Sequence, residues 1–94
     1  MDIRVSVIEA LSVLQESYKS YCHLKDMVNS PNAQDSSSSL LIKKCAIMKF
    51  DDINDLLSWL RLIQCDHQEV SEYQSWHIVN DISEFVKNER QLSL

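Results

Sequence analysis

The chain has 94 residues, a formal net charge of −5 and 45% hydrophobic residues, which is the composition of one small globular domain. It contains no glycine and no run of basic residues longer than Lys43–Lys44, which excludes a glycine-rich phosphate loop and argues against a nucleic-acid partner. No apolar stretch approaches the roughly 18 residues that a membrane span needs, so we expect no membrane partner.

The first predicted element is a long helix from about residue 3 to residue 29. Ser6 and Glu9 have the spacing of a capping box, so the alternative is a helix that begins at Val7 after a short extended arm. We favour the continuous helix, because its apolar residues recur at helical, heptad-like spacing. These residues are Ile3, Val7, Leu11, Leu14, Tyr18, Tyr21 and Val28.

Residues 30–39, SPNAQDSSSS, come next and contain the only proline of the chain. Proline ends a helix, and a run of serines is too polar to pack into a core. The segment therefore predicts a flexible, serine-rich surface loop between two parts of a single domain that covers residues 1–94.

Residues 40–50, LLIKKCAIMKF, fit two structures. Their apolar side chains point nearly all round a helix, which indicates a buried helix, whereas a period of two places most of them on one face of a strand. Few of these residues are β-branched, and Leu, Lys, Ala and Met favour a helix. We predict a helix, with a strand paired to residues 2–5 as the alternative.

Two further helices complete the prediction. Asp51 and Asp52 are expected to cap a helix over 53–64, and Asp66 is expected to cap a last helix that ends near Arg90. Each helix has a regular apolar stripe. The predicted fold is therefore all-α, a small bundle of three or four helices, and the alternative is a small α/β domain with short strands at 2–5 and 40–50.

The cysteines and histidines do not predict a site for chemistry. Cys22, Cys45 and Cys65 form an odd set without close spacing, and neither Cys22-His23 nor Cys65-x-His67 provides paired zinc ligands. A nucleophilic thiol needs a base and an oxyanion hole, and a strained nucleophile turn is hard to build without glycine. We expect no enzyme, no metal and no cofactor, and a metal- or thiol-dependent enzyme is the least favoured alternative.

The same cysteines bear on the cellular compartment. A small secreted domain normally has an even number of cysteines paired in disulfides, so reduced thiols in a cytoplasmic or nuclear protein are expected. The first residues, MDIRVSVIEALSV, lack the basic segment and the continuous apolar core of a signal peptide. We therefore expect no secretion through a cleaved signal peptide.

Several large apolar side chains fall outside the predicted stripes. Trp59 lies on the flank of its stripe and Leu62 lies nearly opposite, while Tyr73 and Trp76 fall on the far side of the last helix. Such residues either pack against 40–50 or form an interface, because Trp and Tyr are enriched in binding hot spots. The residues that we predict to bind a partner are Trp59, Leu62, Tyr73, Trp76, Tyr18 and Tyr21.

The predicted function is a small acidic protein–protein interaction module, such as an adaptor, inhibitor, chaperone or complex subunit. Acidic side chains near the aromatic residues are expected to steer it towards a partner with a basic surface. The heptad-like first helix makes a homodimer a second option. A small α/β regulatory domain is the alternative function, and it goes with the alternative fold.

Overall fold

The computed structural model describes residues 3–29 and 36–92, and these residues form three α-helices. They are α1 (Ile3–Val28), α2 (Ser36–Asp66) and α3 (His77–Leu92), with two short 3₁₀ helices, η1 (Gln68–Glu72) and η2 (Gln74–Trp76), between α2 and α3. No strand occurs in the described ranges. The predicted all-α fold is confirmed and the α/β alternative is wrong, because residues 3–5 lie in α1 and 40–50 lie in α2; residue 2 is outside the described residues.

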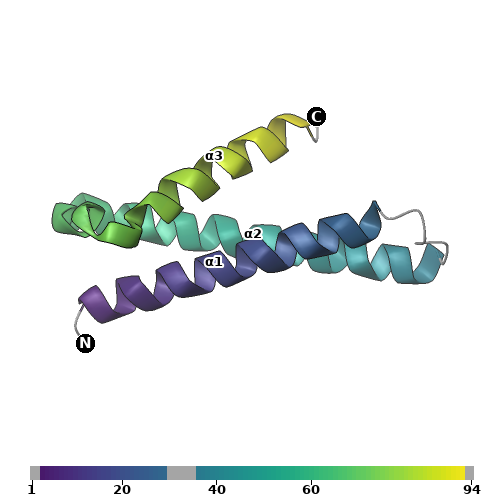
Figure 1. Ribbon diagram of the computed structural model, residues 1–94, viewed down its shortest axis with the longest axis horizontal. Helices are drawn as coiled ribbons and strands as arrows, with labels where there is room; N and C mark the ends of the chain where they lie inside the picture. Colours follow the sequence, from purple (N-terminus) through teal and green to yellow (C-terminus); the bar gives the residue numbers. More distant parts are fainter. Residues whose placement is uncertain (1–2, 30–35, 93–94) are drawn as a thin grey trace.

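Helices α1 and α2 form a long antiparallel hairpin, and α3 folds back across it (Figure 1). The molecule measures 48 × 27 × 18 Å. At about 1.5 Å per residue, the 31 residues of α2 span roughly 47 Å and the 16 residues of α3 only about 24 Å. The hairpin therefore continues beyond the end of α3, and we call this part, residues 21–28 of α1 and 40–50 of α2, the two-helix end.

The hydrophobic core lies where all three helices meet. Each helix buries residues three or four positions apart, as the predicted stripes require. Val70 of η1 and Trp76 of η2 close this core where the chain turns from α2 into α3. The other buried apolar residues are Val7, Ala10, Leu11 and Leu14 of α1, Ile53, Leu57 and Leu60 of α2, and Val79, Ile82 and Val86 of α3.

Two predicted boundaries around 40–50 are wrong. The loop predicted at 30–39 does not extend over 36–39, because α2 begins at Ser36; residues 30–35 lie outside the described residues. The predicted caps Asp51 and Asp52 lie in the middle of α2 with exposed side chains. An aspartate on a solvent-facing position costs a helix only a few tenths of a kcal/mol, and no glycine or proline stops the helix there.

The start of the last helix is also corrected. It begins at His77, ten residues separate it from the end of α2, and η1 and η2 lie within this connection. His67 stands at the N-cap position of η1 without a side-chain cap hydrogen bond, so Asp66 does not make the predicted cap. The burial of Val70 and Trp76 gives a physical reason, because a continuous helix from 67 would not turn the chain back over the hairpin with both side chains inside.

Candidate functional site

The two tryptophans that are predicted to bind a partner differ in their exposure to solvent. Trp59 is 37% exposed and Leu62 is 67% exposed, and both lie on α2 as sequence reasoning expected. Trp76 is only 4% exposed and belongs to the core, so its predicted exposure is wrong. The error follows from the helix boundary, because Trp76 ends η2 and lies outside the helix on which its angular position was assigned.

The three predicted tyrosines are half-buried and pack against the core. Tyr18 and Phe85 meet edge to face with ring centroids 4.8 Å apart, and Tyr21 lies 5.4 Å from Phe50 and 5.8 Å from Phe85. These contacts join α1 to α2 and α3. Tyr73, in the turn between η1 and η2, has a buried hydroxyl that makes no hydrogen bond to any residue that the structure describes. Of the three, only Tyr21 also borders the two-helix end.

The last turns of α3 are fixed to both helices of the hairpin. The Tyr21 hydroxyl donates to Glu89 Oε2 at 2.8 Å, and Lys25 Nζ donates to both carboxylate oxygens of Glu89 at 2.6 and 2.7 Å. On the other side, Arg90 Nη2 donates to Asn54 Oδ1 of α2 at 2.7 Å. These bonds mark the place where the third helix stops covering the hairpin.

The same contacts shift two pKa values. The hydrogen bonds from Lys25 lower the pKa of Glu89 below its usual range, against the opposing effect of burial, and the Tyr21 hydroxyl adds to the lowering. Burial and then the hydrogen bond to Glu89 raise the pKa of Tyr21 to about 12. At neutral pH, therefore, Glu89 carries a full negative charge that Lys25 balances.

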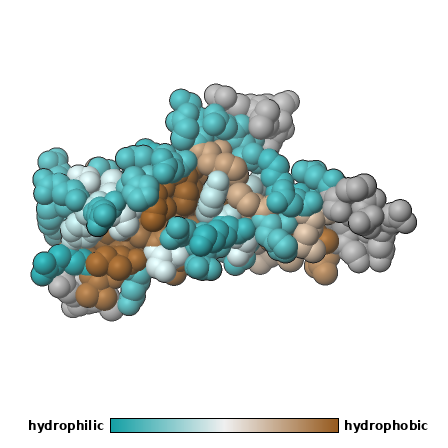
Figure 2. Space-filling view, viewed as in Figure 1, coloured by the Kyte–Doolittle hydropathy of each residue, from teal (hydrophilic) through white to brown (hydrophobic). Residues whose placement is uncertain are grey.

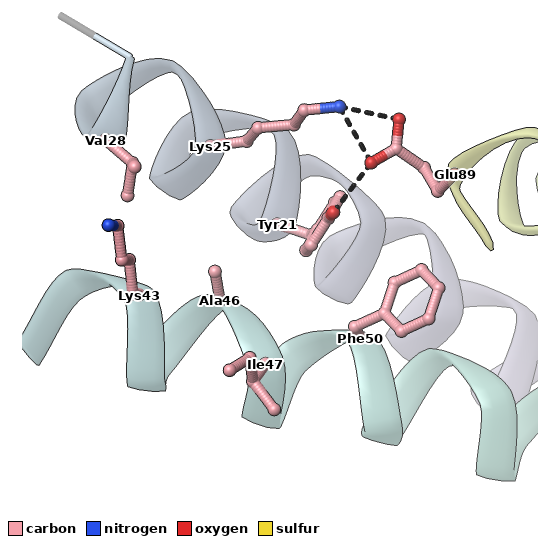
Figure 3. Close-up of a pocket in the computed structure, with 8 residues that line it drawn as sticks. All are labelled: Tyr21, Lys25, Val28, Lys43, Ala46, Ile47, Phe50 and Glu89. Carbon is pink, nitrogen blue, oxygen red and sulfur yellow. Dashed lines mark hydrogen bonds and ion pairs between the residues drawn. The ribbon is translucent and has the colours of Figure 1, made fainter. Parts of the chain in front are cut away.

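Beyond Glu89, a groove opens between α1 and α2, with a volume of about 310 Å³ (Figure 3). Apolar side chains from both helices form its walls, and Val28 and Lys43 face one another at the end away from Phe50 (Figure 3). Glu89 is the single contribution of α3. We call this the α1–α2 groove, and it is lined by Tyr21, Lys25, Val28, Lys43, Ala46, Ile47, Phe50 and Glu89.

Exposed hydrophobic side chains are frequent at the two-helix end, and one of them, Ile47, lines the groove. Ile47 is 62% exposed, and four other large apolar residues of the two-helix end are exposed with it: Met27, Leu40, Leu41 and Met48. On the face that Figure 2 shows, brown surface also lies beside α3 and along the N-terminal part of α1, where Val5 and Ile8 are exposed. At the two-helix end, Val28 of α1 and Ile47 and Phe50 of α2 line the α1–α2 groove.

Charge is divided sharply along α2. Residues 40–50 contain three lysines and no acidic residue, whereas Asp51, Asp52 and Asp55 follow immediately. Lys43 is exposed in the groove and makes no hydrogen bond or ion pair within the described part of the chain. Since the carboxylate of Glu89 is balanced by Lys25, the groove carries a net positive charge on a molecule whose total is −5.

Sequence reasoning missed the residues of this surface other than Tyr21. The signal was present in LLIKKCAIMKF, whose apolar residues surround the helix, but the pattern was taken to indicate burial within the chain. The three lysines in the same segment were the second signal, because a fully buried helix would not place Lys43 and Lys44 on its surface. Both features together are typical of a surface that is covered by another molecule.

Other kinds of site find little support in the geometry. Among residues 3–29 and 36–92, no three His, Cys, Asp or Glu side chains come together in a way that could hold a metal ion. No helix within these ranges is both long and apolar enough to cross a membrane. No protein-family model, curated protein or solved structure matches the chain.

Proposed function

We propose that this chain is a protein–protein interaction module that binds its partner at the two-helix end of the hairpin. The observation that supports the proposal most directly is the exposure of Leu40, Leu41, Ile47 and Met48 on one segment of α2, together with the cavity that Ile47 lines and that α3 leaves open. Exposed apolar residues that cluster around a concavity are typical of interaction sites on soluble proteins. An adaptor, an inhibitor, a chaperone or a complex subunit would each use such a surface.

The total exposed area agrees with a missing partner. A compact monomer of this mass exposes roughly 5,600 Å², whereas this chain exposes 6683 Å². The excess, about 1,100 Å², is larger than the roughly 800 Å² that each protein contributes to an interface of standard size. An elongated shape, with a hairpin longer than the helix that covers it, contributes to this extra surface.

Burial of a few of these side chains provides enough free energy for specific binding. Moving one exposed Leu, Ile or Met fully out of water contributes about 1.5–3 kcal/mol, so three such anchors can offset much of the entropy lost on association. The Trp59 and Leu62 surface lies further along α2, among acidic residues, and neither of these side chains lines the α1–α2 groove. The expectation of a basic partner, made for the surface around the predicted aromatic residues, stays a prediction.

Affinity capture with a matched pair of variants tests the proposal. Ile47→Gln and Leu62→Gln each replace one exposed aliphatic residue of α2, at the two-helix end and away from it. Tagged wild-type chain and both variants are incubated with an extract of the cells that make the protein, and the recovered proteins are quantified by mass spectrometry. Partners should be recovered with wild type and Leu62→Gln and be depleted with Ile47→Gln, at equal helicity by circular dichroism.

Two results would contradict the proposal. If recovery depends on Leu62 and not on Ile47, the binding surface is the Trp59 side of α2. If the same proteins are recovered with all three chains, neither surface binds them specifically. Light scattering on each purified chain provides the control for self-association, because a homodimer would show twice the monomer mass.

A further inference from the structure

We propose that the α1–α2 groove takes an acidic amphipathic helix of a partner protein. This inference rests on the proposed function and names the chemistry of the partner. Two properties of the groove support it, its shape and its charge.

The groove lies where a third helix would pack against α1 and α2. At the three-helix end of the molecule, α3 lies against both α1 and α2 and buries Val79, Ile82 and Val86. Past Glu89 the same two helices continue without a third, and the groove opens where α3 ends (Figures 1 and 3). Residues 40–50 of α2 span about 16 Å, which is the length of a three-turn helix with apolar anchors at i, i+3 or i+4, and i+7.

The charge indicates which helix fits. Lys43 in the groove and Lys44 beside it are exposed, and the segment from Leu40 to Phe50 has no acidic residue that could balance them. Among the described residues that line the groove, the only carboxylate is that of Glu89, and it is bonded to Lys25 and Tyr21. Glutamates or aspartates that flank the anchors of the incoming helix would lie within one screening length of these lysines, about 8 Å at physiological salt.

The same charges disfavour a second copy of this chain as the occupant. In a two-fold dimer centred on the groove, the positively charged surface of each chain would face the same surface of its copy. A bilayer with anionic lipids would also attract exposed apolar residues and lysines. The dimer and the bilayer are therefore measured as competing outcomes.

The test is a selection of helical peptides on the intact chain. The library is displayed on phage and consists of 14-residue peptides. Leucine is fixed at four positions of one helix face, and every other position varies among Glu, Lys, Gln and Ala. The library is selected on immobilised wild-type chain after depletion on the Ile47→Gln variant. We expect enrichment of glutamate at the positions next to the leucines.

The enriched peptide is then synthesised, and its affinity is measured by fluorescence anisotropy. Ile47→Gln should lower the affinity more than about tenfold, because it removes a central apolar anchor. Lys43→Glu should lower it roughly two- to fivefold, as expected for a charge at the rim of an interface. Lys87→Glu, which makes the same charge change on the exposed surface of α3, should leave it unchanged. The loss from Lys43→Glu should shrink as salt is raised.

Each result that contradicts these expectations leads to a different conclusion. Enrichment of lysine, or no preference among the four residues, overturns the acidic character of the partner and leaves the proposed function standing. If no peptide binds wild type better than Ile47→Gln, the groove does not take a helix, and the capture experiment alone then decides the proposed function. A dimer by light scattering that Ile47→Gln dissociates, or binding to phosphatidylserine vesicles that exceeds binding to every selected peptide, overturns the helix in favour of that occupant.

Discussion

The two tryptophans offer a matched pair of truncations whose outcomes should differ. Trp76→Ala removes a core side chain that is 4% exposed, whereas Trp59→Ala removes one that is 37% exposed on α2. The one-third difference in exposed fraction is roughly 80 Å² of a tryptophan surface of about 250 Å², which is worth about 2 kcal/mol. Since truncation of a buried tryptophan costs about 3–5 kcal/mol, we expect a loss of about 4 kcal/mol for Trp76→Ala and about 2 kcal/mol for Trp59→Ala.

Urea denaturation followed by far-ultraviolet circular dichroism measures both losses with the same signal, since this signal reports the helix content of the chain and not the tryptophans. The slope of the free energy of unfolding against urea should be equal in the three chains, and only the midpoints should move. Equal losses, or a larger loss for Trp59→Ala, would refute the packing of η2 against the core. A Trp76→Ala chain too unstable to measure, beside a folded Trp59→Ala chain, would agree with it.

The contacts at the end of α3 and the continuity of α2 give three more predictions. Glu89→Gln should cost about 1 kcal/mol at neutral pH, a value kept small because the Lys25 side chain is 41% exposed. As the folded pKa of Glu89 is lowered, this stabilisation is present above pH 4.5, and denaturation curves should show that it fades as the pH falls further. Tyr21→Phe should cost about 1 kcal/mol. It should also remove a loss of stability between pH 10 and about 12, where the unfolded tyrosine is ionised and the folded one is not; a wild-type curve that is flat there would contradict the burial of this hydroxyl. Asp51→Pro should cost about 3 kcal/mol or more by the same assay, because it interrupts α2, and wild-type stability would mean that a helix ends at Phe50.

The parts of the fold that follow from periodicity could be predicted from the sequence. The seam of α1 and the stripes around Leu57 and Ile82 are local patterns, because the residues that share a face are three or four positions apart. The all-α class follows as well, from these stripes and from the absence of glycine. Each of these inferences needs only the neighbours of a residue along the chain.

The helix boundaries and the site depend on contacts between distant residues, which local patterns do not contain. Aspartates at 51 and 52 suit a helix start as well as a solvent-facing position, and only the packing of residues on both sides of them makes α2 continuous. Trp76 was placed on a helix that starts ten residues later than predicted, so its face was assigned wrongly. The groove depends on where α3 ends along the hairpin, which the bonds of Glu89 to α1 determine.

The two-helix end combines a helix that is stable by itself with side chains that lack a partner. Leu, Lys, Ala and Met, which make up most of residues 40–50, are among the best helix formers, so this part of α2 does not need a third helix to stay helical. The contact of Tyr21 with Phe50 holds it against α1. A groove that is formed before binding loses little conformational entropy when a partner docks, so more of the free energy from burying Ile47 and its neighbours is available for affinity. Under the proposed function, the apolar residues that α3 leaves exposed at the end of the hairpin stabilise a complex rather than the fold.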